Sequence, residues 1–315
     1  MVQDSYVQGR VGAIHLGWDV LTVAAGGGDK PIRPVAVEGS YTTPAYLLAD
    51  RDGQLHTSGV ERSRPDLGVA IADVRDILGY PQIVVAGATW PASSVYRARF
   101  FNPMSAIAEY FGSPFDVLAL PFPDGWPEEK VDALVELVET LGLPVEPLPE
   151  SVAVAGYVRA MGLVDDDSAR HGDGGTTAVY SDGRSAVVVA VHGDEGRPTE
   201  SVDVAVPAQA TVDSAVADVL VGEVIAAARA VGADTSSVVL MGNVCFNDPL
   251  RLAFQNHLGR RLRVSDHPVH AVVLGAASLL VTEGFEPVGP GAHSAPSPMD
   301  GPTERIEADP RGSHG

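Results

Sequence analysis

Apolar positions in this chain form short continuous runs that alternate with helical patterns, which is typical of α/β proteins. One such run, residues 238–241, stops at Gly242 and Asn243, and a helical pattern begins at Pro249 after the possible cap Asp248. Proline suits a first helical position because its φ is already fixed and it has no N–H to leave unpaired. This segment therefore predicts a strand, a glycine turn and a helix.

The pattern continues to about residue 281. Leu250, Ala253, Phe254 and Leu258 share one helical face, a short strand is expected over residues 261–264, and the run AVVLGAA at 271–277 predicts another helix. Because Gly275 and its neighbours have little or no side chain, we expect another backbone to pack close against this last helix.

The first third of the chain predicts hairpins. Residues 11–16 and 19–24 flank Gly17 and Trp18, and residues 34–59 alternate around the turn Asp52-Gly53. A helical pattern then ends at Gly79. The segment after it is rich in aromatic residues and arginine, which suits either a partner surface or simple core, and a helix is expected around residues 104–111.

The middle of the chain predicts a buried strand over 115–121, a helix that ends at Gly142, a short strand, and a helix that starts at Glu150. A carboxylate at a helix N-terminus is stabilised by the helix dipole. Glu150 is thus either an ordinary helix-start acid or a group that orients water or an ion. The later hairpin is expected to turn at residues 181–185, which contain Asp182 and Gly183, and not at the loop 173–177, although that loop superficially resembles a phosphate loop.

Composition narrows the classes of partner. The net charge of −20 over 315 residues argues against nucleic-acid binding, which requires clustered Lys and Arg. Cys245 is the one cysteine, so no internal disulfide is possible and a cytoplasmic location is the simplest interpretation. No apolar run reaches the ~20 residues that a membrane-spanning helix needs, so no direct membrane insertion is expected. The Pro/Gly/Ser-rich residues 284–315 predict a disordered acidic tail, and residues 1–10 an N-terminal arm.

Several segments, in this order and spacing, resemble the actin-like ATPases, and most closely the ATPase domain of heat-shock-70 (DnaK-type) chaperones. They include Thr42-Thr43-Pro44 before a strand and an Asp-Gly turn, PESVAVAGY at 149–157, and AVVLGAA at 271–277. The resemblance implies an α/β, two-lobed actin-like ATPase (ribonuclease-H-like) fold, with mixed sheets flanked by helices. It implies a first lobe at 11–163, an acidic Gly-rich linker at 164–175 and a second lobe at 176–283. Too few residues separate Ser181 from Gly242 for the outer subdomain that this family carries there.

The resemblance also implies a site between the lobes. Glu150 and Arg75 match the family's catalytic glutamate and lysine, and they would act only if the protein is active. The nucleotide-facing turns would contain Gly17, Asp19, Asp182, Gly183, Gly242 and Asn243. Simpler interpretations stay open, because Arg75 also suits a surface residue paired with Asp73 or Asp76, and Asp19 and Asp182 also suit ordinary turns. No set of metal ligands is expected.

Key family positions differ in this chain. His15 stands in place of the first metal-positioning acid and Ser181 in place of the second, while Trp18 and Asp19 replace two hydroxyl residues. Only the first glycine of the family's Gly-Gly turn is kept, since Asn243 follows Gly242. We therefore expect a degenerate, non-hydrolysing scaffold or adaptor that binds an unknown protein partner and has no cofactor. The alternative is an ATP-binding, weakly ATP-hydrolysing chaperone-like protein that uses ATP and Mg²⁺, and a small-molecule kinase of the same fold is a third hypothesis.

Overall fold

The structure is a computed structural model that describes residues 9–57, 64, 66–164, 175–193, 197 and 199–283. All described elements fall within one compact unit, Met1–Phe285. Most of the expected N-terminal arm (1–10), nearly all of the expected linker (164–175) and the whole expected tail (284–315) lie outside the described residues. The expectations for those three segments stay predictions.

The first sheet is mixed and has the strand order β11-β10-β1-β2-β3, with β4 paired to β2. Its central strands are apolar in continuous runs because both of their faces are buried. Strand β1 is antiparallel to β2 and parallel to β10. The strands are β1 (Val11–Leu16), β2 (Val20–Gly27), β3 (Lys30–Pro34), β4 (Thr43–Pro44), β10 (Val117–Phe122) and β11 (Val145–Pro149).

The second sheet repeats this arrangement, with the order β14-β13-β12-β15-β16. In each sheet the first three strands along the chain form a meander in which each strand is antiparallel to the next. The last two strands are added on the other side of the first strand and run parallel to it. The strands are β12 (Gly175–Ser181), β13 (Ser185–His192), β14 (Glu200–Ala205), β15 (Val238–Gly242) and β16 (Leu262–Val264). Two mixed sheets flanked by helices confirm the predicted α/β class.

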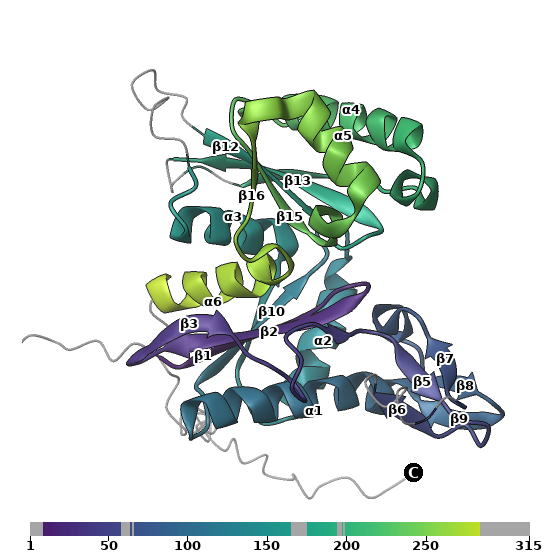
Figure 1. Cartoon of the computed structure of the whole chain (residues 1–315). Coiled ribbons are helices and arrows are strands. Elements are labelled where there is room, and N and C mark those ends of the chain that lie inside the picture. Colours follow the sequence, from purple (N-terminus) through teal and green to yellow (C-terminus); the bar gives the residue numbers. More distant parts are fainter. Residues whose placement is uncertain are drawn as a thin grey trace, which may run out of the picture. The chain divides into compact units, whose positions relative to one another are not determined.

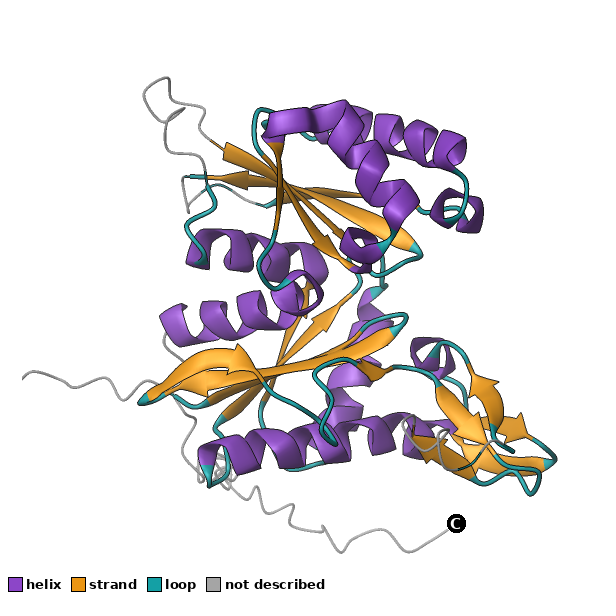
Figure 2. Cartoon of the chain, viewed as in Figure 1, coloured by secondary structure: helices purple, strands orange, loops and turns teal. Residues whose placement is uncertain are grey.

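Helices cover both faces of each sheet (Figures 1 and 2). Helices α1 (Ala92–Phe111) and α2 (Glu128–Glu139) pack on the outer face of the first sheet, and α4 (Ser214–Ala230) and α5 (Asp248–Leu258) on the outer face of the second. Helices α3 (Glu150–Ala160) and α6 (Ala271–Glu283) lie between the two sheets. We call each sheet with its outer helices a lobe.

The first lobe carries two further small sheets, β6-β5-β7 and the hairpin β8-β9. The hairpin of β5 with β6 turns through Asp52 and Gly53, as the sequence predicts. The remaining elements are β5 (Leu47–Ala49), β6 (Leu55–Thr57), β7 (Gly68–Ile71), β8 (Gln82–Val85), β9 (Ala88–Pro91), and the short 3₁₀ helices η1 (Val74–Ile77), η3 (Ala208–Thr211), η4 (Asn243–Phe246), η5 (Gly259–Arg261) and η6 (Pro268–His270).

Some boundaries differ from the sequence predictions. The helical pattern that was expected to end at Gly79 is only the 3₁₀ helix η1, preceded by strand β7. Helix α1 begins at Ala92, well before residue 104, so Tyr96 and Phe100 of the aromatic segment are core residues on that helix. Helix α5 is capped by Asn247, whose side chain accepts from the N–H of Leu250, and not by Asp248.

The contact between α3 and α6 holds the two lobes together. Helix α3 follows the last strand of the first lobe yet packs against β13, whereas α6 follows the second lobe and packs against β1 and β2. A Cβ atom on Gly275 would overlap the carbonyl oxygen of Ala153, and one on Gly156 would lie 2.6 Å from Leu279 Cγ. The predicted close backbone approach at Gly275 is confirmed.

None of the helices in the described part of the chain has the length and apolar character needed to cross a bilayer.

We predict that Gly275→Ala destabilises the protein by about 1–3 kcal/mol, since the added methyl group must push α3 away from α6. Gly222→Ala is the matched control. Gly222 is an exposed glycine inside α4 with open space around its Cα, so alanine is expected to add about 0.5–1 kcal/mol of stability. Urea unfolding of both variants measures the difference. Similar effects of the two substitutions would contradict the close packing.

Candidate functional site

The tips of two hairpins, one from each lobe, meet in this structure. One turn, residues 17–19, joins β1 to β2, and the other, residues 182–184, joins β12 to β13. The backbone N–H of Trp18 donates a 2.9 Å hydrogen bond to Oδ2 of Asp182. Gly183 lies next to Asp19, since a Cβ at that position would be 3.0 Å from Asp19 Oδ2. The lobes are therefore joined where their equivalent hairpins turn.

The end of β15 reaches the same place. Gly242 pairs with Ser181 across the parallel strands, and its φ of 88° and the nearby Ser181 carbonyl leave no room for a Cβ. Because Gly242 turns the chain sharply, Asn243 points back at the hairpins. Its side-chain Nδ2 donates to Asp19 Oδ2 at 3.3 Å and to the carbonyl oxygen of Asp182 at 3.4 Å.

Arg75 lies at the centre of these contacts. It belongs to η1, where the Asp73 side chain caps the helix by accepting from the N–H of Arg75. The guanidinium is buried and forms ion pairs with Asp73 at 3.3 Å, with Asp182 at 3.3 Å and with Glu150 at 3.9 Å. One arginine thus connects η1, the start of α3 and the hairpin tip of the second lobe. The interpretation of Arg75 as a surface residue is wrong, although its pairing with Asp73 is confirmed.

Glu150 is the first residue of α3 and is 4% exposed. Its Oε1 lies 2.8 Å from Nε2 of His15, which is also buried and pairs with Thr22 near the hairpin end of the contact between β1 and β2. When the carboxylate is ionised it can only accept, and the donor is then the N–H of His15 Nε2. The Glu150 carboxylate is thus contacted by the His15 ring and by the Arg75 guanidinium.

The Trp18 ring covers the outside of these ion pairs. The guanidinium of Arg184 stacks on the ring, and that of Arg75 lies 5.8 Å from the ring centre. Arg184 also approaches Asp73 at 3.8 Å, although half of its side chain is exposed. We define the interlobe cluster as His15, Trp18, Asp19, Asp73, Arg75, Glu150, Asp182, Arg184 and Asn243.

The cluster brings four carboxylates together with two guanidinium groups. Burial raises the pKa of Asp19 and of Asp73 above the ordinary value of 3.8, because their charged forms lose water. At Arg75 burial acts to lower the pKa, but the nearby carboxylates, led by Asp182, outweigh it and raise the pKa. Arg75 therefore stays charged and neutralises acids that would otherwise repel one another.

The chemistry available here is restricted. In the part of the chain that the structure describes, no three His, Cys, Asp or Glu side chains are arranged to hold a metal ion. A phosphate that entered between the hairpin tips would meet the carboxylates of Asp19 and Asp182 and would have to separate Arg75 from its partners. The arrangement is suited to holding two lobes together.

The structure brings all of the sequence-predicted site residues into this one region. Sequence reasoning missed Arg184, and it considered Asp73 only as a surface partner of Arg75. The sequence feature that could have identified Arg184 is its position next to Asp182 and Gly183 in a predicted hairpin turn. Nothing local showed that its side chain would stack on Trp18, a residue 166 positions earlier in the chain.

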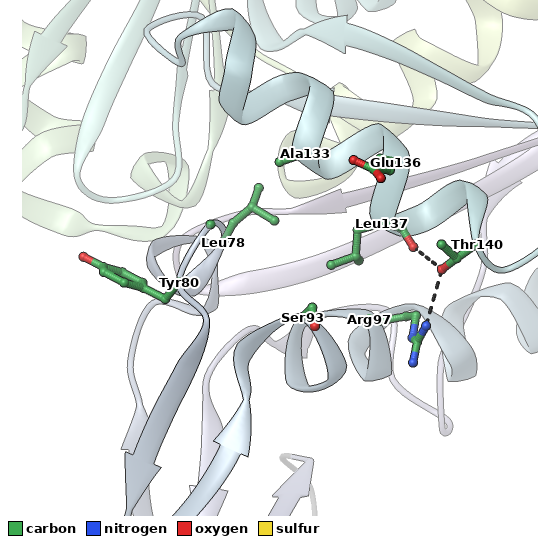
Figure 3. A pocket seen from close by; sticks show the side chains of 9 residues that line it. Leu78, Tyr80, Ser93, Arg97, Ala133, Glu136, Leu137 and Thr140 are labelled. Atoms are coloured by element: carbon green, nitrogen blue, oxygen red, sulfur yellow. Dashed lines mark hydrogen bonds between the residues drawn. The ribbon is translucent and has the colours of Figure 1, made fainter.

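A sizeable cavity lies away from the interlobe cluster. It has a volume of about 350 Å³ and is bounded by α1, α2 and the segment after η1 (Figure 3). Arg97 and Glu136 supply its charged groups, and Arg97 is 3.5 Å from the Thr140 hydroxyl. None of its lining residues belongs to the cluster.

Comparison with known proteins adds no family assignment. No protein-family model matches the chain, and a search of curated proteins finds no match.

We predict that Arg75→Met destabilises the protein by about 3–5 kcal/mol, because removing one partner of a buried ion-pair cluster leaves uncompensated carboxylates. Arg184→Met, which removes a half-exposed guanidinium from the same cluster, is expected to cost roughly 1 kcal/mol or less. Denaturant unfolding near neutral pH provides the measurement. Equal losses in the two variants would show that Arg75 is not the central charge.

We also predict that Asp19→Asn stabilises the protein at neutral pH. The raised pKa of Asp19 means that the folded state holds this proton more tightly than the unfolded state, so ionisation of Asp19 costs stability. That cost is fully present above the folded-state pKa and disappears below the ordinary pKa of 3.8. The melting temperature of the variant should therefore exceed that of the unaltered protein at neutral pH, and the two should converge as the pH falls below 3.8. A variant that is less stable at neutral pH would refute this account.

Proposed function

We propose that this protein is a degenerate member of the actin-like ATPase superfamily, similar to the heat-shock-70 ATPase domain. In this proposal it is a non-hydrolysing scaffold or adaptor in the cytoplasm, and it acts through protein–protein interaction. The observation that carries the proposal is the interlobe cluster. The chain's own side chains occupy and connect the two hairpin tips between which an actin-like ATPase would hold phosphates.

The repeated strand order of the two sheets supports the fold assignment. Apart from the short 3₁₀ helices and from β4 to β9 of the first lobe, each lobe runs strand-strand-strand-helix-strand-helix-strand. Helices α3 and α6 lie between the sheets. A duplicated unit of this kind is what the sequence resemblance implies. Between β14 and β15 there are only η3 and α4, which agrees with the absence of the family's outer subdomain in the second lobe.

The chemistry of the cluster supports the loss of hydrolysis. Phosphoryl transfer depends on a positioned metal ion and on neutralisation of phosphate charge. His15 and Ser181 stand where the resemblance would place metal-positioning acids, and the Trp18 N–H is already bonded to Asp182. Binding a phosphate there would require breaking that bond and would place like charges side by side.

The surface of the second lobe supports a protein partner. The neighbouring elements α4, η4 and α5, and the residue that follows η3, each carry one large apolar side chain that is about half to three-quarters exposed. These side chains are Val212, Val219, Phe246 and Leu252. Exposed apolar residues grouped on adjacent elements are typical of a protein-binding surface.

The alternative is an ATP-binding, weakly hydrolysing chaperone-like protein. It is favoured by one observation, the position of Glu150 and Arg75 at 3.9 Å from each other beside both hairpin tips. If the lobes separated, Arg75 would be free to counter phosphate charge and Glu150 to orient water. Mg²⁺ would then have to come with the nucleotide.

We predict no calorimetric binding of Mg²⁺-ATP at millimolar nucleotide and no phosphate release above that of a buffer blank. The variants Glu150→Gln and Trp18→Ala serve as comparisons, because the first removes the candidate catalytic acid and the second removes the ring that covers the cluster. Micromolar binding with turnover that Glu150→Gln abolishes would overturn the scaffold proposal in favour of the alternative. Binding that appears only in Trp18→Ala would support a blocked ancestral site.

A further inference from the structure

A second cavity in the first lobe has a different character from the one in Figure 3. It lies where α1 meets the small sheets of this lobe (Figure 1) and has a volume of about 230 Å³. Most of its lining is apolar, and the polar groups come from three residues, His56, Ser94 and Arg99. The apolar lining consists of Leu47, Leu55, Trp90, Val95 and Ala98.

Arg99 is unusual because it is charged, buried and incompletely paired. Its side chain is 4% exposed, and one terminal nitrogen, Nη2, donates to the carbonyl oxygen of Pro44 at 2.9 Å. Its Nε is buried with no hydrogen-bond partner, and within the described residues no carboxylate lies at ion-pair distance from it. The acid whose charge acts to raise the pKa of Arg99 is Glu38. Glu38 is exposed and accepts a hydrogen bond from Asn102.

An arginine remains protonated even when buried, so its charge must be compensated in another way. Buried charges in proteins are normally paired, because an isolated ion in a medium of low dielectric constant is costly. The same lobe shows the normal solution at Arg75, which has three carboxylate neighbours. At Arg99 the neighbouring space is a cavity, and none of the described residues supplies the missing anion.

The cavity adds a second group that favours an anion. His56 lines it, and its Nε2 lies 3.1 Å from Oδ2 of Asp50, which orients the ring. By contrast, the cavity in Figure 3 is lined by an acid, Glu136, as well as by Arg97. One buried guanidinium, a nearby imidazole and a mostly apolar wall therefore distinguish the Arg99 cavity.

We propose that the Arg99 cavity binds an organic monocarboxylate, with the carboxylate paired to Arg99 and a compact apolar group against Trp90, Leu47 and Leu55. A monoanion matches the one buried guanidinium, whereas a phosphate dianion would bring a second charge into an apolar space. The volume is below the roughly 300 Å³ at which pockets for drug-sized ligands begin, so the apolar group is small, such as one ring or a branched chain. The carboxylate belongs either to a free acid or to the C-terminus of a peptide that ends in an apolar residue.

The test is calorimetric titration of the full chain with 3-phenylpropionate and with its neutral isostere 3-phenylpropanamide. The acid should bind at least about tenfold more tightly than the amide, because a charge-assisted pair with Arg99 exists only for the acid. Arg99→Met should remove this preference, and Arg97→Met, on the same helix and facing the other cavity, should keep it. The peptide acetyl-Ala-Ala-Phe, with a free and with an amidated C-terminus, separates the two sources of the carboxylate.

Equal affinity for acid and amide, or no binding of either at millimolar concentration together with no binding of the free-carboxylate peptide, would overturn the proposal. An unchanged preference in Arg99→Met would overturn it as well. If Arg99→Met does not fold, as judged by circular dichroism, the comparison of acid with amide on the unaltered chain still decides. Nucleotide binding plays no part in these outcomes, so they stand apart from the function proposed for the interlobe cluster.

Discussion

The close packing of α3 against α6 is the constraint on which the arrangement of the two lobes depends. Gly156 and Gly275 allow the helices to approach until backbone meets backbone, and each helix packs on the sheet of the lobe that did not lead into it. Interiors packed this closely do not deform gradually. The distance between the sheets is thereby set, and with it the distance at which the hairpin tips of β1–β2 and β12–β13 face each other.

At that distance the hairpin tips need charge compensation, and Arg75 supplies it. Four carboxylates lie close together in a region where burial disfavours charged groups. A guanidinium has several N–H donors and can therefore pair with more than one of these carboxylates. Replacing such a group with apolar residues often costs little, so the cluster need not add net stability. Its effect is to favour one relative position of the lobes, which is what a scaffold requires and what a nucleotide-dependent opening would have to undo.

The first lobe uses its two buried arginines in different ways. Arg75 is surrounded by acids from three elements, while Arg99 faces an apolar cavity and keeps an unsatisfied Nε. Both side chains are nearly inaccessible to water, so burial opposes the charge of each. The two sites differ in the source of the anion. In the interlobe cluster the chain itself provides the carboxylates, and in the proposed cavity site an external molecule provides the carboxylate.

The sequence by itself determined the α/β class, most strands and the turns at Asp52-Gly53 and Asp182-Gly183, because runs of apolar residues and Asp-Gly pairs act locally. It misjudged the start of α1, since Pro103 inside that helix weakens the local pattern and packing of Tyr96 and Phe100 overrides it. It could name the charged residues of the site but not their partners. The bonds that decide the site join residues 135 and 164 positions apart, as in His15 to Glu150 and Trp18 to Asp182, and only the tertiary structure brings such groups together.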